Sequence, residues 1–341
     1  MITQPDGESS GGITPGEISI VSTSLSNSDI IGSWKARWGI NRMNYKVAPG
    51  LYGVGRPDES SPVLVSANYK MSFDRLRKEL SGIDAWILVI DTKGINVWCA
   101  AGKGTFGTDE VVRMAALTNL SERVSHRKLI LPQMGAPGVA AHEVLKRSGF
   151  KVIYGPVKAS DLPRFLQEGM KATPEMRTVR FPLLDRLVLV PIELMQVVKP
   201  VLGVAAALFI LQLLGIWSVT LAGTIPYIGA VLVGCVLVPI LLPWIPGRAF
   251  AWKGWLLGLV WAAAVIWYNN QSPSLSFGWN SVLVYLLILP AISSFLAMNF
   301  TGASTYTSLS GVKREMRIAV PGIIVSAGLG LVLMALNQSV F

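Results

Sequence analysis

The chain has 341 residues, of which 51% are apolar, and a formal net charge of +10. This length suggests about two domains, and the charges are divided unevenly between two parts of the sequence. Residues 1–200 contain 25 Lys or Arg and 19 Asp or Glu, whereas residues 201–341 contain five and one. The second part cannot present an ordinary charged surface to water, so the composition excludes a single soluble domain.

Cysteine content and charge pattern exclude several further classes. Two cysteines, Cys99 and Cys235, are too few for a disulfide framework, a cysteine-rich zinc site or an iron–sulfur cluster held by this chain alone. Redox chemistry therefore requires another protein or a cofactor. The basic residues of the first part are interspersed with nearly as many acidic ones, so no nucleic-acid partner is expected.

The first 30 residues are rich in Gly, Ser and Pro and lack the basic start and apolar core of a secretory signal. Their composition predicts a disordered leader at residues 1–30. Because no secretory signal precedes it, the domain expected at residues 31–184 is predicted to stay in the cytoplasm.

Short apolar runs alternate with helical patterns after about residue 60. Residues 85–91 (AWILVID) form a continuous apolar run, as expected of a central parallel strand. Three further strands are predicted at residues 61–69, 128–133 and 150–155. The repetition of strand and helix predicts an α/β domain of the doubly wound, Rossmann-like type, with ligands bound at the carboxyl ends of the strands.

Three helices are predicted between these strands. Ser72 is expected to cap the first, Thr108 to begin the second, and residues 138–148 to form the third. The side chains expected to be buried on the first two helices are Phe73, Leu76 and Leu80, and Val112, Ala115, Ala116 and Leu120.

Glycine-rich loops follow two of the strands and suit close approach of a ligand to the backbone. They are DTKGINVWCAAGKGTFGTDE (91–110) and MGAPGVAAHE (134–143). The first contains Gly102, Gly104 and Gly107, formally a G-x-G-x-x-G motif. However, about ten residues separate these glycines from the strand, and no acidic residue stands at the distance a dinucleotide site requires. A Walker-type phosphate loop also fails, because Lys103 is followed by glycine.

Cys99 is the only thiol in the first part of the chain and lies near the start of a predicted short helix. The helix N-terminus and Lys103 are both expected to favour the thiolate. A buried structural cysteine is the alternative. Nucleophilic catalysis by Cys99 would need a base, and the two histidines are poor candidates: His126 is expected at the surface and His142 as a packed or surface polar residue.

The second part contains five stretches that are long and apolar enough to cross a membrane. They are residues 200–218, 221–243, 251–268, 281–300 and 318–336. Basic residues lie between the second and third spans and before the fifth, whereas loop 269–280 has none. The positive-inside rule therefore predicts a multi-pass protein of the cytoplasmic (inner) membrane with a cytoplasmic N-terminus and an external C-terminus.

The predicted spans contain almost no ionisable residues, which favours a membrane anchor over a transporter. Cys235 lies in the middle of a span. It is interpreted as a small apolar filler, with a route for a soft metal ion as the alternative. Residues 185–199, which include Glu193 in an apolar run, are predicted to form an interfacial linker between the two parts, and residues 200–341 the transmembrane domain.

One segment resembles a known family. Asn96, Val97, Trp98, Cys99, Ala100, Ala101, Gly102, Lys103 and Gly104 resemble the cap-helix motif of the HgcA family, the membrane corrinoid proteins of microbial mercury methylation. The resemblance extends through residues 49–80 and 131–157, which are also similar to the large subunit of the corrinoid iron–sulfur protein of acetogens. With the five spans, it covers nearly the whole chain after the leader.

The resemblance implies a cobamide bound in its base-off form at the carboxyl edge of the sheet. Cys99 would be the lower axial ligand of cobalt, and residues 96–103 would form a helix against the lower face of the corrin. Trp98 and the small residues Ala100, Ala101 and Gly102 would allow close approach. The expected cofactor contacts extend to Gly135 and Ala136 in the second glycine-rich loop. The chain lacks D-x-H-x-x-G, the motif that supplies a histidine ligand in many cobalamin proteins.

The activity that the resemblance implies is transfer of a cobalt-bound methyl group to Hg(II), forming methylmercury. The methyl group would come from a methyltetrahydrofolate-linked donor. Electrons would come from an HgcB-type ferredoxin with two 4Fe–4S clusters, because the chain lacks the four-cysteine cluster domain of the acetogen subunit. Two alternatives remain: a membrane-anchored corrinoid methyl carrier with another acceptor, and a transporter with a regulatory nucleotide-binding domain. The latter predicts carboxylates within the spans, which the sequence lacks.

Overall fold

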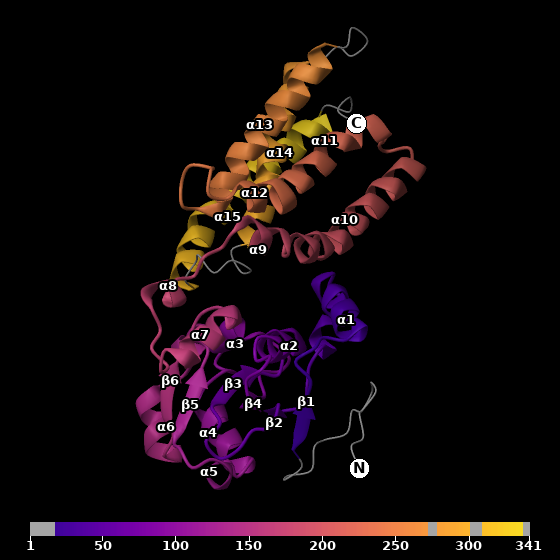
Figure 1. Ribbon diagram of the computed structural model, residues 1–341. Coiled ribbons are helices and arrows are strands. Elements are labelled where there is room, and N and C mark those ends of the chain that lie inside the picture. Colours follow the sequence, from indigo (N-terminus) through magenta and orange to yellow (C-terminus); the bar gives the residue numbers. More distant parts are fainter. Residues whose placement is uncertain (1–17, 272–277, 301–308, 337–341) are drawn as a thin grey trace. The chain divides into compact units, whose positions relative to one another are not determined.

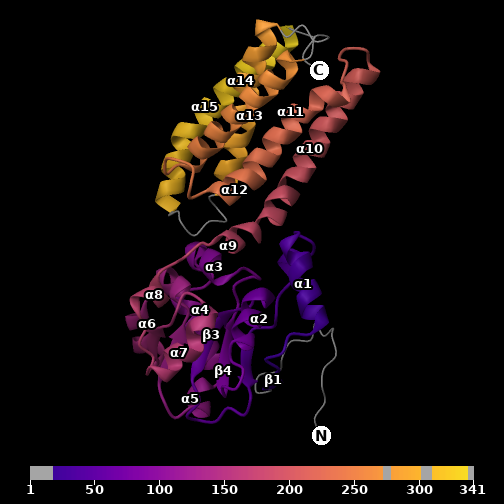
Figure 2. The same cartoon turned by 45° about the horizontal axis from the view of Figure 1, so that its top comes forward.

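The computed structural model describes residues 18–271, 278–300 and 309–336 (Figure 1). The chain forms two compact units. One consists of residues 1–36 and 40–179, and the other of residues 37–39 and 180–341, as far as they are described. Figure 2 shows the same strands and helices from a second direction.

The first unit is built on a six-stranded sheet in the order β1-β2-β4-β3-β5-β6. Strands β3, β4, β5 and β6 are parallel, β2 is antiparallel to β4, and β1 is parallel to β2. The strands are β1 (Ser19–Val21), β2 (Gly50–Val54), β3 (Val63–Ala67), β4 (Ala85–Ile90), β5 (Lys128–Leu131) and β6 (Lys151–Tyr154).

The helices of this unit connect the strands and flank the sheet (Figures 1 and 2). They are α1 (Asn27–Arg37), α2 (Lys70–Lys78), α3 (Val97–Lys103), α4 (Thr108–Leu117), α5 (Leu120–Arg123), α6 (Ala141–Ser148), α7 (Leu162–Gln167) and α8 (Pro174–Arg177). Three short 3-10 segments join them: η1 (Arg42–Asn44), η2 (Gln133–Gly138) and η3 (Ala159–Asp161).

The central strand β4 is buried along its whole length. Its side chains alternate between two apolar clusters: Leu88 and Ile90 belong to one, and Ile87 and Val89 to the other. Since successive side chains of a strand point to opposite faces, both faces of the sheet are covered. This confirms the prediction of an α/β sheet domain whose parallel strands end at one edge.

Several local predictions were wrong. The sheet is not wholly parallel, because residues 50–54 add an antiparallel strand whose two glycines weaken the strand signal. Ser72 does not cap α2, which begins at Lys70 after the extended residue Tyr69. The predicted third helix begins only at Ala141, because residues 133–138 form the 3-10 turn η2, which contains a proline.

The buried stripe of α4 is also shifted by about one residue. Val111, Met114 and Ala115 are buried, whereas Val112 is half-buried and Ala116 is exposed. Leu120 is buried but belongs to the separate helix α5. Tertiary packing against the sheet, rather than the apolar pattern alone, sets the rotation of such a short helix.

The predicted leader was too long. Residues 1–17 lie outside the described residues, but Ser19–Val21 form β1 and residues 27–30 begin α1. Ile18 and Val21 pack against the two apolar clusters of the sheet domain. The start of the domain was misplaced because the prediction relied on the polar composition of this segment, which does not reveal the contacts of Ile18 and Val21.

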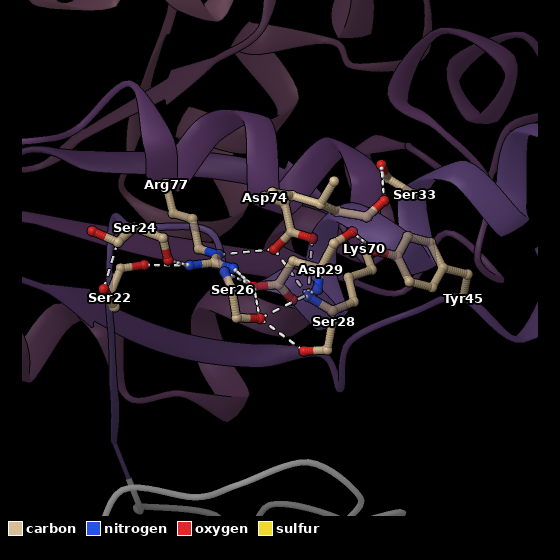
Figure 3. Close-up of polar contacts among 11 residues, drawn as sticks. Ser22, Ser24, Ser26, Ser28, Asp29, Ser33, Tyr45, Lys70, Asp74 and Arg77 are labelled. Atoms are coloured by element: carbon tan, nitrogen blue, oxygen red, sulfur yellow. Dashed lines mark hydrogen bonds and ion pairs between the residues drawn. The ribbon is translucent and has the colours of Figure 1, made fainter.

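A buried ion-pair network joins α1 to α2 (Figure 3). Asp29 of α1 and Asp74 of α2 each accept hydrogen bonds from both Lys70 and Arg77. The Arg77 side chain is only 8% exposed and the Asp74 side chain only 6%. A buried carboxylate, Asp74, and a partly exposed one, Asp29, thus face two cations, and removal of Arg77 or Asp74 leaves uncompensated buried charge.

The network also holds the backbone of the segment before α1. Arg77 Nη1 donates to the carbonyl oxygens of Ser22 and Ser24. Burial opposes ionisation of Asp29, but hydrogen bonds from Lys70 and Ser26 and the charge of Lys70 outweigh it, so the pKa of Asp29 lies well below its usual value. Residues 22–29 are therefore tied to α2 by charge-assisted contacts.

The second unit consists of helices. They are α9 (Leu183–Leu187), α10 (Val190–Leu213), α11 (Leu221–Leu232), α12 (Val238–Leu241), α13 (Phe250–Asn270), α14 (Trp279–Asn299) and α15 (Leu309–Leu336), with a π-helical turn η4 (Val233–Leu237) between α11 and α12. Five helical segments are long and apolar enough to cross a membrane: residues 183–213, 221–241, 250–270, 279–299 and 311–336.

The second, third and fourth segments match the predicted spans within two residues, and the fifth ends where predicted but begins seven residues earlier. The first was misplaced, because it runs over residues 183–213 and not 200–218. The predicted orientation stays a prediction. Residues 185–199 do not form a separate linker. They belong to α9 and α10, which are separated only by a turn at residues 188–189, and they continue into the first apolar segment because their apolar run suits a helix. Cys235 is buried within η4. The C-terminal residues 337–341 and most of the loop before α14 lie outside the described residues.

Buried cations complete the helix ends of this unit. Arg186 donates to the carbonyl oxygens of Pro239 and Ile240, and Lys253 donates to those of Leu242 and Ile245. The last carbonyl groups of a helix have no partner within it, so the two cations satisfy the end of α12. The two charged side chains therefore have a structural role, as donors to backbone carbonyl groups.

Replacing Arg77 by Ala should lower the local stability of the β1–α1 segment by about 3 kcal/mol, which corresponds to a roughly 100-fold faster amide exchange. Hydrogen exchange of residues 19–37 in the full chain in detergent measures it. Arg164→Ala, which removes an exposed ion pair with Glu168, is the control and should leave exchange unchanged. Equal rates in wild type and Arg77→Ala would contradict a stabilising network.

Exchange of the same segment should depend on pH through Asp29. Because the folded pKa is lowered, the stabilisation is fully present above the unfolded value of about 4 and is lost as the pH falls below it. In Asp29→Asn this acid-dependent loss should be smaller than in wild type. A wild-type segment whose stability does not change between about pH 6 and pH 3 would contradict the assignment.

Candidate functional site

The carboxyl ends of the parallel strands β3, β4 and β5 meet at one edge of the sheet. Asn68 follows β3, Asp91 and Thr92 follow β4, and η2 begins shortly after β5. Helix α3 lies between β4 and α4 and packs against η2. The edge thus combines polar strand ends with a short helix, as in other open α/β sheets that bind ligands.

Asn68 organises the loop that leads to α3. Its side chain is 2% exposed. The Oδ1 atom accepts hydrogen bonds from Thr92 N (3.1 Å), Thr92 Oγ1 (2.9 Å) and Gly94 N (2.9 Å), while Nδ2 donates to Asp91 Oδ1 (3.1 Å). Sequence analysis missed this residue. The available signal was an asparagine directly after a buried strand.

Helix α3 begins with a side-chain cap. Asn96 accepts a hydrogen bond from Cys99 N through its side chain (2.9 Å), and Gly104, with φ of 81°, ends the helix. An asparagine at the N-cap and a glycine at the left-handed C-terminal position are the preferred residues for these places. The prediction that Cys99 lies near the start of a short helix is confirmed.

One face of α3 is closed by packing inside the domain. Ala100 and Ala101 are 0% and 6% exposed. A Cβ added to Gly138 of η2 would lie 2.2 Å from Phe106 O and 3.0 Å from Ala101 Cα. The small residues therefore permit close contact between α3 and η2, and the expected contacts of Ala100 and Ala101 with a cofactor stay a prediction.

Gly135 is buried for a similar reason. A Cβ at this position would lie 2.5 Å from the Phe106 ring. Gly135 therefore packs against the domain core, whereas Ala136 is half-buried. The expected contacts of both residues with a cofactor stay a prediction. The second glycine-rich loop therefore packs against the buried face of α3.

The other face of α3 is open. Cys99, Gly102 and Lys103 have helical i, i+3, i+4 spacing and so share this face. Cys99 is half-buried, Gly102 and Lys103 are exposed, and a Cβ added to Gly102 would meet no atom within 4 Å. Val97 and Trp98 are half-buried beside it. A flat group has room to approach the helix backbone at Gly102 while the thiol of Cys99 stands one turn away.

Electrostatics at Cys99 differ from the prediction. Burial raises the pKa of the Cys99 thiol, and the opposing effects of Lys103, Arg42 and the hydrogen bond to Asn96 do not fully offset it. The net pKa is therefore raised, so the expectation of a favoured thiolate was wrong for the free thiol. Desolvation of a half-buried sulfur outweighs a helix of only two turns.

Gln133, the first residue of η2, adds an unsatisfied acceptor at the same edge. Among the described residues, its Oε1 atom is buried and has no hydrogen-bond partner. Buried side-chain oxygens are usually paired, so Gln133 Oε1 is an acceptor that a donor from a bound group could satisfy.

The histidines do not join the site. His126 is half-buried, with Nε2 2.9 Å from Ser61 O and Nδ1 accepting from Lys128 N (3.2 Å). His142 lies on α6 and is exposed. No group of three or more His, Cys, Asp or Glu suited to a metal ion occurs among the described residues. Gly102 of the G-x-G-x-x-G motif lies within α3, Gly104 ends that helix and Gly107 precedes α4. Because these glycines do not turn directly out of β4, the structural context of a dinucleotide site is not met.

Comparison with known proteins links this domain to one enzyme system. A family model described as CO dehydrogenase/acetyl-CoA synthase delta subunit matches residues 38–166. This range contains α3 and all strands from β2 to β6, and it ends before the first apolar segment. The similarity therefore concerns the α/β domain.

Curated relatives are named as gamma subunits of the acetyl-CoA decarbonylase/synthase complex. The subunit of Methanopyrus kandleri is 36% identical over 125 residues, which are 36% of this chain and 27% of that protein. The subunit of Archaeoglobus fulgidus is 29% identical over 129 residues (37% and 27%), and gamma 2 of Methanosarcina thermophila is 33% identical over 125 residues (35% and 26%). The chain spans about a quarter of the length of these relatives.

Replacing Asn68 by Ala should destabilise the loop before α3 by about 2 kcal/mol, because Thr92 and Gly94 lose a buried acceptor. Hydrogen exchange of residues 91–99 should rise about 30-fold, measured on the full chain in detergent. Ser66→Ala, two residues earlier and similarly buried, is the control, since the Ser66 hydroxyl donates to Ala67 O rather than to a group of this loop. Unchanged exchange in Asn68→Ala would contradict the role assigned to the amide.

Proposed function

We propose that the chain binds a cobamide on the open face of α3 and uses it to transfer a methyl group to Hg(II), forming methylmercury. The observation that carries the proposal is the half-buried Cys99 on an N-capped helix at the carboxyl edge of the sheet, one turn from a glycine whose Cα faces open space. The similarity of residues 38–166 to subunits of acetyl-CoA-forming complexes and the resemblance of residues 96–104 to the HgcA cap helix support it.

The residues present fit such a group. A thiol is a soft donor suited to a transition metal. Gly102 leaves room for a flat macrocycle. Gln133 Oε1 is a buried acceptor without a partner, and the amide groups at the rim of a corrin are suitable donors. Imidazole ligation is not supported, because His126 is engaged with Ser61 and Lys128 and His142 is exposed on another helix.

Cys99, its N-cap residue Asn96 and the nearby cations would each contribute to binding the cofactor. Cys99 would bind cobalt from below as the thiolate, in place of the nucleotide base of the cobamide. Its proton must leave on binding, because the free thiol has a raised pKa, and Lys103 and Arg42 would stabilise the negative charge. Asn96 holds the sulfur-bearing turn through Cys99 N. When bound, the cobamide supplies a metal centre that carries the methyl group, with cysteine as an electron-rich ligand suited to an electrophilic acceptor.

The proposal requires partners. The chain has two cysteines, and its described residues offer no cluster site, so electrons would come from an HgcB-type ferredoxin. The methyl group would come from a methyltetrahydrofolate-linked donor. The five apolar segments would hold the protein in the inner membrane, with the α/β domain in the cytoplasm, where both partners are available.

A second candidate has the same cofactor and a different acceptor. The curated relatives are named for a complex that makes or cleaves acetyl-CoA, and their names contain no mention of mercury. A membrane-anchored methyl carrier with another native acceptor is therefore the alternative. Both candidates use Cys99 in the same way and differ only after the methyl group has been loaded.

The cofactor and its ligand are tested by visible spectroscopy of the protein purified in detergent with a cobamide supply. Wild type should retain a corrinoid with a base-off spectrum. Cys99→Ala should lose the corrinoid or shift its spectrum, because cobalt loses its lower sulfur ligand. The matched control is Cys235→Ala, which removes the other cysteine, in the second unit, and should leave the spectrum unchanged. A folded wild type without corrinoid would overturn the proposal.

The acceptor is tested in two further measurements. Methylmercury formation from Hg(II) should require wild-type chain and reductant and should fall at least 100-fold in Cys99→Ala. A deletion strain grown without mercury separates the two candidates: normal growth supports mercury as the acceptor, whereas a growth defect restored by wild type but not by Cys99→Ala supports another native acceptor.

A further inference from the structure

Large exposed apolar side chains of the α/β half are concentrated in one segment. Nine such side chains are described before residue 180, and six of them lie within residues 30–43. These six are Ile30, Ile31, Trp34, Trp38, Ile40 and Met43, and their exposed fractions range from 41% to 65%. The surface they form, called here the α1 surface, is an apolar cluster of the kind that marks a partner or membrane contact.

The α1 surface is presented by a fixed helix. Ile30, Ile31, Trp34 and Trp38 follow helical spacing on one side of α1 and the turn after it, whereas Ala36 is fully buried on the other side. Asp29 on the same helix is anchored to Lys70 and Arg77 (Figure 3). The ion pairs therefore hold α1 with its apolar stripe outward.

The charges around the α1 surface are basic. Residues 27–46 contain Lys35, Arg37, Arg42 and Lys46, and their one acidic residue, Asp29, is neutralised within the buried network. Lys35 and Lys46 are exposed. Basic side chains beside exposed tryptophans and isoleucines form the pattern of an interfacial helix on an anionic membrane.

The last residue of α1 and the two residues after it are assigned to the second unit. Residues 37–39 belong to the compact unit of the membrane-spanning candidates. Within that unit, a Cβ added to Gly39 would lie 3.2 Å from the Ile192 side chain, near the start of α10. The last residue of α1 is thus part of the unit that enters the bilayer.

We propose that the α1 surface lies in the interface of the bilayer that the C-terminal helices cross, with Trp34 and its apolar neighbours among the lipid chains and Lys35 and Lys46 at anionic headgroups. The occupant is the lipid surface rather than a protein, because tryptophan at a membrane boundary, basic flanks and attachment to the membrane unit coincide here. This gives the α/β domain an attachment to the lipid surface in addition to its chain connection to α9 and α10.

The test is photo-crosslinking in the full chain. The variant Trp34→p-benzoylphenylalanine and the control Leu117→p-benzoylphenylalanine are reconstituted in vesicles of phosphatidylcholine and phosphatidylglycerol. Leu117 is a suitable control because it is also large, apolar and about half exposed (52%), but lies on α4. After illumination, mass spectrometry of the proteolysed chain identifies lipid adducts.

Position 34 should yield at least fivefold more lipid adduct than position 117, and the yield should fall at least twofold in vesicles of phosphatidylcholine alone. Lys35→Glu in the position-34 variant should produce a comparable fall. Equal yields at the two positions would overturn the proposal, as would a crosslink from position 34 to a second copy of the chain in place of lipid. Corrinoid retention is recorded in parallel, so that failure of this proposal is distinguished from misfolding.

Discussion

The candidate site depends on the hydrogen bonds made by the side chain of Asn68. One buried amide accepts three hydrogen bonds from the loop after β4 and donates one to Asp91. These bonds connect the ends of two parallel strands and set the position from which α3 starts. Without them, the loop backbone would leave buried polar groups unpaired, and a helix of two turns has little stability of its own.

Helix α3 has one buried and one open face, and its small residues have different roles on the two faces. Ala100 and Ala101 are small because η2 approaches them closely through Gly138. Gly102 is small where nothing in the described chain touches it. In a motif of consecutive small residues, only this last position is free to receive a ligand, and Cys99 shares its face. The raised pKa of the thiol further indicates that a thiolate at this position depends on what binds it.

In the second unit, several charged side chains bond to backbone groups at the ends of helices. Arg186 and Lys253 donate to carbonyl groups at the end of α12, and Glu315 accepts from Ala251 N at the start of α13. Unpaired backbone groups are costly in lipid, and these side chains satisfy them. These three contacts therefore lie at the ends of helices.

The sequence by itself determined the division into an α/β half and five apolar helices, the four parallel strands, and the short helix that begins at Asn96 and contains Cys99. These features depend on local properties: apolar runs, charge distribution and capping residues, which act within a few neighbouring positions. Only the tertiary structure decided that residues 19–37 belong to the folded domain, that β2 is antiparallel, which face of α3 is open, and that Asn68 and Gln133 lie at the site. Those features depend on contacts between residues far apart in the chain, such as Asp29 with Arg77 and Ala101 with Gly138, and no local pattern encodes them.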